Sequence, residues 1–456
     1  MTDLLKISTE IIDNPDVDPG FIPGPTSRIT RELSELSTDV AMVEAFSHCI
    51  VFRTDDGLLA FDTSGKHHAG KVVSAIRGWS SDRFNTLVYT HGHIDHVGGC
   101  GAFLADAADR GEPKPRIAGH ENIAPRFDRY RLTNRYNLLI NQRQFMGYAP
   151  KGQELRGINA FLPEETEAPQ LVYRDRLDIS VGGLDVQLHH ARGETDDHTW
   201  AWIPEHKAIC AGDFFIWCFP NAGNPQKVQR YPLEWAAAMR SMASQGAELF
   251  LPAHGLPIAG KGRISRVLTD VAEALETLVR DTLTLMNEGA RLNDVIHGVQ
   301  IPQDVLAKPY LVPLYDEPEF VVRNIWRMYG GWHDGNPAHL KPARERELAV
   351  ALADLAGGAG ALADKALESV DSNIRLACEL VELATQAAPE DIGIHGKRAE
   401  IYQARRDRET SLMAKGIFGY AAGESMAQIN APENSKDNTR DNSSSDSSTD
   451  SSTEGG

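Results

Sequence analysis

The spacing of apolar residues along the chain changes near residue 265. Before that point, short apolar runs alternate with polar turns, as in HCIVFRTDDGLLAFDT (48–63), where an Asp-Gly turn separates two predicted strands. After it, apolar residues recur at helical spacing over long segments such as ISRVLTDVAEALETLVRDTLTLMNEGA (264–290). This pattern predicts an α/β domain followed by an all-helical one.

The predicted strands of the first domain alternate with helices. A helical stretch, HAGKVVSAIRGW (68–79), is followed by a strand, FNTLVYT (84–90), and then by an alanine-rich helix, GCGAFLADAADRG (99–111). Further strands are predicted at LDISVGGLDVQLHHA, HTWAWIP, KAICAGDFF and AELFLPAHG, between residues 177 and 255. This order is typical of layered α/β structure. Residues 121–165, dense in Arg, Asn, Tyr and Gln, are expected to form an insertion over a site and not a core element.

These patterns divide the chain into three regions. We expect an α/β domain over residues 1–270, a helical domain over 271–426 and a disordered tail over 427–456. The paired helices resemble tetratricopeptide-like stacking, although they have no strict repeat period. The acidic tail is rich in Ser and Asp and has almost no apolar residue, so it cannot bury enough surface to offset the entropy of ordering.

Composition narrows the classes of function. The 456-residue chain has a formal net charge of −18, which argues against nucleic acid or an anionic membrane as its main partner. Its five cysteines lack CxxC spacing and are expected to be free thiols in a reducing compartment. The chain shows neither a secretory signal nor a long apolar stretch typical of a membrane span. We therefore expect a soluble cytoplasmic protein.

Candidate chemistry is concentrated in one loop, THGHIDHVGG (90–99), directly after the strand FNTLVYT. His91, His93, Asp95 and His96 carry imidazole and carboxylate groups, which are good ligands for zinc and related divalent ions. The two alternate histidines can point the same way from a tight loop, and the Asp-His pair can then face a second ion. A polar turn without a ligand role is disfavoured by this density of ligand-type residues.

A site with two ions needs further ligands from later in the chain. Three candidates stand at the ends of apolar strands, namely Glu194, Asp213 and His254. Taken singly, each has an ordinary alternative role as a surface carboxylate, a helix cap or a loop residue. Their common position after strands, in this order behind the histidine loop, favours a joint metal site.

The motifs HGHIDH, GET near 194, GD at 212–213 and PAHG at 252–255 resemble the metallo-β-lactamase superfamily. That resemblance implies an αβ/βα sandwich with metals at one edge of two facing sheets. Glu194 stands where most members have histidine, and such a glutamate is typical of the alkylsulfatase branch. The segment VVRNIWRMYGGWHDGNPAHLKP (321–342) is similar to the signature of that branch's helical dimerisation domain. The resemblance therefore implies a hydrolase and a homodimer.

The resemblance also implies two zinc ions per chain. The ligands would be His91, His93 and Glu194 for one ion, Asp95, His96 and His254 for the other, and Asp213 as the bridge between them. Asp95 is also expected to be catalytic, since hydrolysis should depend on it. Two such ions lower the pKa of a bridging water, so that hydroxide is available near neutral pH. The branch tends to have glutamate at the bridging position, where this chain has aspartate.

A small anionic substrate would need fixed donors, for which the planar fork of arginine is suited. The polar residues that could supply them are Arg129, Tyr130, Arg135, Asn137, Asn141, Arg143, Asn221, Asn224, Lys227 and Arg230. Among these we favour Asn137, Arg143 and Lys227 as substrate contacts. Most of the others are expected to be solvated or structural.

Two further features of a substrate site stay open at the level of sequence. A leaving alkoxide would need a proton donor, and His198 and His120 are both candidates. The run FFIWCF (214–219) could form an apolar wall for an alkyl chain, and it could equally belong to the core.

Other functions fit the same motifs less well. The alternative within the fold is hydrolysis of another ester, a thioester or a lactone on the same metals. Redox chemistry at iron is disfavoured because diiron relatives typically have glutamate where His93 stands. A degenerate scaffold is disfavoured by the complete ligand set, and a nuclease by the charge of −18.

Overall fold

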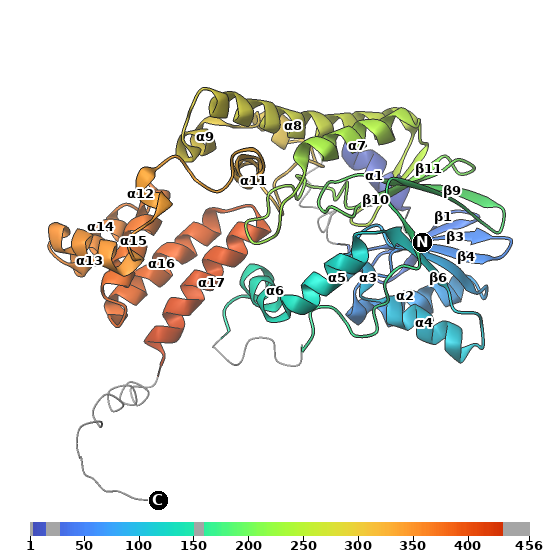
Figure 1. Cartoon of the computed structure of the whole chain (residues 1–456), viewed down its shortest axis with the longest axis horizontal. Coiled ribbons are helices and arrows are strands. Elements are labelled where there is room, and N and C mark those ends of the chain that lie inside the picture. Colours follow the sequence, from blue (N-terminus) through green and yellow to red (C-terminus); the bar gives the residue numbers. More distant parts are fainter. Residues whose placement is uncertain (1–2, 15–27, 150–158, 432–456) are drawn as a thin grey trace, which may run out of the picture. The chain divides into compact units, whose positions relative to one another are not determined.

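The computed structural model describes residues 3–14, 28–149 and 159–431, which form two compact units. The first unit comprises residues 3–14, 28–146, 159–342 and 409–416, and the second comprises residues 147–149, 343–408 and 417–431. Figure 1 colours the first unit mainly from blue to yellow and the second in orange and red. Most of the predicted tail, from residue 432 on, lies outside the described residues.

Two sheets form the centre of the first unit (Figure 1). The seven-stranded sheet has the order β1 (Leu33–Ser37), β2 (Val40–Val43), β3 (Cys49–Thr54), β4 (Gly57–Phe61), β5 (Phe84–Val88), β6 (Arg116–His120) and β7 (Leu171–Tyr173). The six-stranded sheet has the order β13 (Ile258–Ala259), β12 (Leu249–Pro252), β11 (Ala208–Gly212), β10 (Thr199–Ile203), β9 (Leu184–His190) and β8 (Arg176–Val181). The strands predicted from apolar runs are all present.

The first sheet changes from antiparallel to parallel pairing at β4. Strands β1 to β4 pair antiparallel, and β4 to β7 pair parallel. The predicted Asp-Gly turn joins β3 to β4, with Thr54 paired to Gly57. Gly57 has a φ of 104°, and a Cβ at this position would lie 2.5 Å from the carbonyl oxygen of Arg83. The hairpin therefore requires glycine at this turn.

Helices cover both outer faces of the paired sheets. Val51, Leu58 and Leu87 of the first sheet pack in one apolar cluster with α2 and α4, while Phe52 and Phe250, from facing strands, belong to another cluster that includes α7 and α8. Figure 1 shows α2 and α4 on one side of the strands and α7 and α8 on the other. The first unit is thus the expected αβ/βα sandwich.

The helices of the first unit vary widely in length. They are α1 (Leu4–Asp13), α2 (Lys66–Trp79), α3 (Ile94–Val97), α4 (Cys100–Asp109), α5 (Ile123–Leu132), α6 (Asn134–Asn141), the π-helix η2 (Gln142–Met146), α7 (Pro232–Ser244), α8 (Lys261–Asn287), α9 (Leu292–Gly298), α10 (Gln303–Leu306), α11 (Pro318–Gly330) and α12 (Pro337–Leu340).

The prediction that residues 121–165 form an insertion and not a core element is wrong for the described part of that segment. Residues 123–146 form α5, α6 and η2, and Phe127, Tyr130 and Leu138 are buried in the cluster that contains the first sheet's outer face. These apolar residues recur at helical spacing, but the surrounding Arg, Asn and Gln residues hide the periodicity. The segment is therefore part of the core and can hold polar side chains in fixed positions.

The second unit is all-helical, as predicted. Its helices are α13 (Glu345–Ala356), α14 (Ala359–Glu368), α15 (Ile374–Ala387), α16 (Ile392–Arg408) and most of α17 (Leu412–Ile429). Small residues such as Ala366, Ala377 and Ala384 form much of its buried interior. The tetratricopeptide-like stacking stays a prediction.

The compact units divide the chain downstream of the predicted boundary. Residue 270 lies inside α8, whose apolar face packs in the same cluster as the second sheet, and the first unit continues to Pro342. The last helix, α17, ends at Ile429, three residues beyond the predicted end of the helical domain at residue 426. The domain limits stay predictions at this level.

All five cysteines are free thiols, as expected from their spacing. Across the described ranges, no helix has both the length and the apolar character that crossing a bilayer demands.

Candidate metal centre

Each predicted metal ligand follows the end of a strand at one edge of the sandwich. The loop after β5 carries His91 and His93 and runs directly into the short helix α3, which carries Asp95 and His96. The other three predicted ligands follow β9, β11 and β12, and these are Glu194, Asp213 and His254. Since β11 and β12 are parallel and β9 points the same way, their carboxyl ends meet at one edge.

The structure brings the seven predicted ligands into two adjoining groups. In the first group, which contains His91, His93, Glu194 and Asp213, the ligand atoms lie within 4.8 Å of one another. His91 Nε2 is 2.8 Å from His93 Nδ1, and His93 Nδ1 is 3.6 Å from Glu194 Oε1. The second group contains Asp95, His96 and His254 at the same maximum spacing.

Asp213 connects the two groups through its two oxygens. Its Oδ2 lies 3.9 Å from His91 Nε2, while its Oδ1 lies 3.3 Å from His96 Nε2 and 3.5 Å from His254 Nε2. Asp95 Oδ2 closes the second group, at 3.5 Å from His96 Nε2 and 3.4 Å from His254 Nε2. The carboxylate of Asp213 therefore stands between two sets of three ligand-type side chains.

Several of these polar atoms are buried without a hydrogen-bond partner. They are His96 Nε2, Glu194 Oε2 and Asp213 Oδ1. An unpaired polar atom in the protein interior costs free energy, and native proteins rarely leave one unless an ion or a water completes it. Imidazole nitrogens and carboxylate oxygens at this spacing suit zinc. The residues present therefore fit a pair of divalent cations.

The charge states of the two histidines in the first ligand group suit ligation. Burial holds the pKa of His91 and His93 well below the usual range, which keeps both imidazoles neutral and able to bind metal. Burial raises the pKa of Glu194 well above its usual value, although the Arg230 guanidinium opposes this. Burial opposes the charged form of His96 as well, but the carboxylates around it, Asp213 foremost, outweigh burial and raise its pKa. Divalent cations bound here would offset the repulsion among these buried carboxylates.

A carboxylate that sequence reasoning missed orients His96. His96 Nδ1 donates to Asp62 Oδ2 at 2.8 Å, and Ser47 Oγ lies 3.1 Å from the same nitrogen. Asp62 also accepts from the backbone nitrogen and the hydroxyl of Thr90, both at 2.8 Å. These bonds fix the ring so that Nε2 faces the cluster. Asp62 ends β4 as Asp213 ends β11, so the strand-end rule could have found it.

A buried arginine on α5 holds the loops of both ligand segments, and nothing in the sequence pointed to it. Arg126 Nε donates to Asp197 Oδ2 at 2.6 Å, and a second nitrogen of Arg126 donates to Asp196. Asp197 Oδ2 also accepts from the backbone nitrogen of Gly92, between the first two histidines, at 3.2 Å. A Cβ on Gly92 would lie 2.7 Å from Arg126 Cδ, so this packing requires glycine.

Glu194 is held by two residues from the loop after β11. Asn221 Nδ2 donates to Glu194 Oε1, and Arg230 Nη1 lies 3.1 Å from the same oxygen and donates to the Glu194 backbone carbonyl. Arg230 is only 1% exposed. Both belonged to the predicted set of polar donors, although neither was favoured as a substrate contact.

Of the three favoured substrate contacts, Lys227 is the one whose charge interacts with the ligand carboxylates. Burial lowers the pKa of Lys227 to about 8, and Asp95 and Glu194 oppose this effect. Asn137 Nδ2 instead donates to Thr133 within its own helix, at 2.7 Å from the hydroxyl. The exposed side chain of Arg143 donates to Gln226 Oε1 at 3.0 Å. Substrate contact by these residues stays a prediction.

Both candidate proton donors, His198 and His120, have other contacts in the structure. His198 Nε2 accepts from the backbone nitrogen of Asp213 at 3.1 Å, and burial lowers the pKa of His198 to about 3. His120 packs against His190, with ring centroids 3.8 Å apart, and burial lowers its pKa as well. Burial therefore favours the neutral form of both rings, and proton donation by either stays a prediction.

The run FFIWCF belongs to the core. Phe215, Trp217 and Phe219 are at most 2% exposed, and Trp217 Nε1 donates to the carbonyl of Leu256 at 2.7 Å. These buried ring side chains therefore do not form an apolar wall for an alkyl chain.

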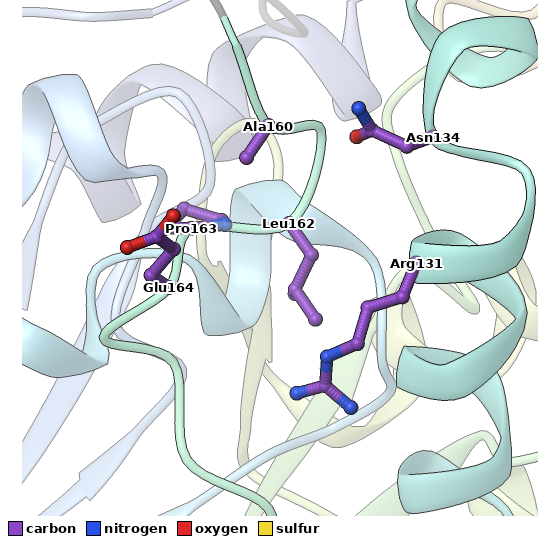
Figure 2. A pocket seen from close by; sticks show the side chains of 6 residues that line it. All are labelled: Arg131, Asn134, Ala160, Leu162, Pro163 and Glu164. Atoms are coloured by element: carbon purple, nitrogen blue, oxygen red, sulfur yellow. The ribbon is translucent and has the colours of Figure 1, made fainter.

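A pocket of about 370 Å³ lies apart from the ligand cluster. Figure 2 shows its lining, which comes from α5, α6 and the segment that follows residue 158, namely Arg131, Asn134, Ala160, Leu162, Pro163 and Glu164. No predicted metal ligand lines it.

Two family models match successive parts of the chain. The metallo-beta-lactamase superfamily matches residues 43–254, which include every predicted metal ligand. The alkyl sulfatase dimerisation family matches residues 291–428.

Individual relatives agree with these matches. A linear primary-alkylsulfatase from Pseudomonas sp. is 27% identical over 316 residues, which cover 66% of this chain and 59% of the relative. An (R)-specific secondary-alkylsulfatase from Pseudomonas sp. is 24% identical over 335 residues, covering 68% of this chain and 48% of the relative. The chain thus spans about half of the length of these relatives.

A solved structure shares the fold. The stereoselective inverting sec-alkylsulfatase Pisa1 from Pseudomonas sp. superposes with a TM-score of 0.76 at 20% identity, over 88% of this chain and 66% of that one. This likeness shows the fold, while the two family matches place residues 43–254 in the metallo-beta-lactamase superfamily and residues 291–428 in the alkyl sulfatase dimerisation family.

Proposed function

We propose that the chain is a dinuclear zinc-dependent hydrolase of alkyl sulfate esters. The observation that carries this proposal is the position of Asp213, whose two oxygens face two different sets of three ligand-type side chains. The three buried polar atoms without partners in the same cluster support it. Two zinc ions bound here would lower the pKa of a water between them and supply hydroxide near neutral pH.

The protein's own residues would position the ions and the substrate. The neutral imidazoles of His91 and His93, with Glu194, suit one ion, while Asp95, His96 and His254 suit the other. Asp62 would keep His96 in the tautomer that leaves Nε2 free to bind metal. Asn221 and Arg230 would fix the carboxylate of Glu194.

Lys227 is the group best suited to the anionic head of a sulfate ester. Its Nζ lies 3.2 Å from Asn141 Oδ1 and 5.9 Å from the centre of the Phe161 ring. Its side chain is partly exposed, and burial, together with the Arg230 guanidinium, lowers its pKa. A sulfate group bound beside it would favour its charged form. The curated relatives are named as alkylsulfatases, which favours this head group over a thioester or a lactone.

We also propose that the chain acts as a homodimer in the cytoplasm. Support for the dimer comes from the dimerisation family that matches residues 291–428. Light scattering of the full chain should give twice the mass of one chain, and a monomer at micromolar concentration would refute this part.

A hydrolysis screen of the zinc-loaded protein tests the proposed activity. Primary and secondary alkyl sulfates, carboxylic esters, thioesters and lactones should be compared with the Asp213→Ala variant as the blank. We expect sulfate release from the alkyl sulfates by the unmodified protein alone. Turnover of a thioester or lactone without any sulfate release would favour the alternative chemistry on the same metals.

A further inference from the structure

One large aromatic residue is exposed in a stretch that is otherwise buried. From residue 40 to residue 52, through β2, its following loop and most of β3, every residue is buried except Phe46. Phe46 is 50% exposed. Leaving a phenylalanine in water forgoes the stabilisation that its burial would give. A scattered surface aromatic needs no explanation, but one held out of a fully buried stretch beside a metal cluster does.

The loop that carries Phe46 is fixed on both sides. His48 bonds to the carbonyl of Gly255 through Nε2 at 2.9 Å, and its backbone nitrogen donates to the carbonyl of Ala253 at 2.7 Å. Ser47 Oγ lies 3.1 Å from His96 Nδ1. On the other side, Arg28 pairs with the buried Glu44 at 2.5 Å. The exposed ring is therefore held in place by the same residues that surround the metal ligands.

Phe46 lies next to the open side of the ligand cluster. Its ring stands edge-on to the imidazole of His254, with centroids 5.8 Å apart, and lies 6.4 Å from the ring of His68. The side chains of Asp95 and His254 are 23% and 15% exposed, whereas those of His91 and His96 are fully buried. His93 is 21% exposed as well, so the open side of the cluster runs over Asp95, His93 and His254, and the Phe46 ring lies beside it next to His254.

We propose that Phe46 binds the apolar chain of the substrate and sets the preference for chain length. This inference rests on the proposed sulfate ester hydrolysis and adds a binding contact to it. The ring side chains of the run FFIWCF are buried and cannot serve, so Phe46 takes the role that the sequence suggested for them. An alkyl chain that leaves the metals along this side would cover the exposed face of the ring.

Binding of unreactive analogues tests the proposal separately from catalysis. Linear alkanesulfonates of one to ten carbons keep the anionic head, and their carbon–sulfur bond resists hydrolysis. Calorimetric titration of the zinc-loaded full chain should show affinity rising about two- to fourfold per methylene, the factor for partial to full burial of a CH₂ group. In Phe46→Ala this factor should fall towards one, with methanesulfonate affinity unchanged.

Two variants serve as controls. Phe46→Leu keeps an apolar side chain and should retain most of the chain-length dependence. Leu132→Ala removes an apolar residue that is 85% exposed on α5 and should leave the dependence unchanged. Because Phe46 is half exposed, Phe46→Ala should fold normally, with the same zinc content and the same thermal midpoint within about 2 °C.

The outcomes separate this inference from the proposed function. Sulfate release by the unmodified protein, with the same chain-length dependence in Phe46→Ala, overturns the role of Phe46 and leaves the function standing. An equal loss of affinity at every chain length, methanesulfonate included, overturns it too, because Phe46 would then support the metal site. Conversion of a dimer to a monomer in Phe46→Ala also contradicts it, by assigning the ring to an interface. Absence of sulfate release from every ester overturns both proposals.

Discussion

The metal centre and the helical unit both bury polar side chains, but they satisfy them differently. In the helical unit, Arg398 donates to Glu382 at 2.7 Å, to the carbonyl of Ala421 at 2.8 Å and to Ser425 at 3.0 Å. His395 likewise bonds to Ser425 and to the carbonyl of Pro389. At the metal centre, by contrast, three buried ligand-type atoms have no hydrogen-bond partner.

This difference distinguishes structural polar groups from functional ones. Folding alone selects against a buried polar atom without a partner, and Arg398 and His395 of the helical unit are paired accordingly. A cluster whose buried atoms stay unpaired must be stabilised by something other than contacts within the folded chain. At the metal centre that stabilisation comes from the binding of cations, for which His96, Glu194 and Asp213 are already oriented.

Removing the shared carboxylate should produce the largest effect. Asp213→Ala takes away the group common to both ligand sets and should lower hydrolysis about a thousandfold or more, because bound metal supplies several kcal/mol of charge stabilisation. In a chelator at neutral pH the same variant should be less stable than the unmodified protein, because His96 and His254 outweigh burial and lower the pKa of Asp213, which makes its charged form stabilising. Initial rates measure the loss of hydrolysis, and denaturant unfolding measures the change in stability. Full activity of Asp213→Ala, with two zinc ions retained, would contradict the contrast between the metal centre and the helical unit.

A buried carboxylate outside the ligand cluster should reveal the cost of burial through pH. Asp316 accepts from the backbone nitrogens of Gly223, Asn224 and Glu317, yet burial raises its pKa from 3.8 to about 6. Folding therefore favours its protonated form. Its contribution to stability is complete below pH 3.8 and is lost as the pH rises through about 6.

The variant Asp316→Asn isolates this effect because its amide does not titrate. Between pH 4 and pH 7, in a chelator, the unfolding free energy of the unmodified protein should fall relative to that of Asp316→Asn by about 3 kcal/mol. Urea unfolding at several pH values measures the difference. A difference that stays constant with pH would show that backbone donors satisfy this carboxylate fully.

The buried arginine near the ligand loops should affect metal affinity more than folding. Arg126→Lys keeps the charge but loses the planar fork that reaches Asp196 and Asp197, so the loop around Gly92 loses its support. Zinc affinity should fall roughly 10–100-fold, the range for partners of metal ligands, with activity restored by excess zinc. Competition with a chromogenic chelator measures it. Arg174→Lys, which alters an exposed pair with Glu121, is the matched control and should change nothing.

The smallest effect is expected in the helical unit. Arg398→Met removes a guanidinium whose partners Glu382 and Glu424 are partly exposed, so water can take over part of its role. Stability should fall by about 1–2 kcal/mol, without any change in zinc content. Denaturant unfolding and elemental analysis provide the two readouts. Loss of zinc in Arg398→Met would mean that the two regions are coupled and the contrast between them is invalid.

Much of the fold and the ligand cluster could be predicted because both follow simple local rules. Apolar runs predicted many of the strands, though not β1, β2, β6, β7 or β13, and the density of histidine and aspartate at strand ends predicted where ligand-type groups meet. Asp62 follows the same rule but was missed, since a single aspartate after a strand is common.

Contacts between distant side chains could not be predicted in the same way. Arg126 acts through Asp197, 71 positions away, and no spacing in the sequence connects them. The apolar face of α5 and α6, with Phe127 and Tyr130, was hidden by the polar residues around it. Phe46 is notable only because its neighbours are buried, and burial is a property of the folded chain.

Anomalous scattering at the zinc absorption edge, from crystals of the zinc-loaded protein, tests the central claim most directly. We expect two peaks per chain, one among His91, His93 and Glu194 and the other among Asp95, His96 and His254. The carboxylate of Asp213 should lie between them. A single peak, peaks elsewhere in the chain, or an Asp213 side chain turned away from both would contradict the account.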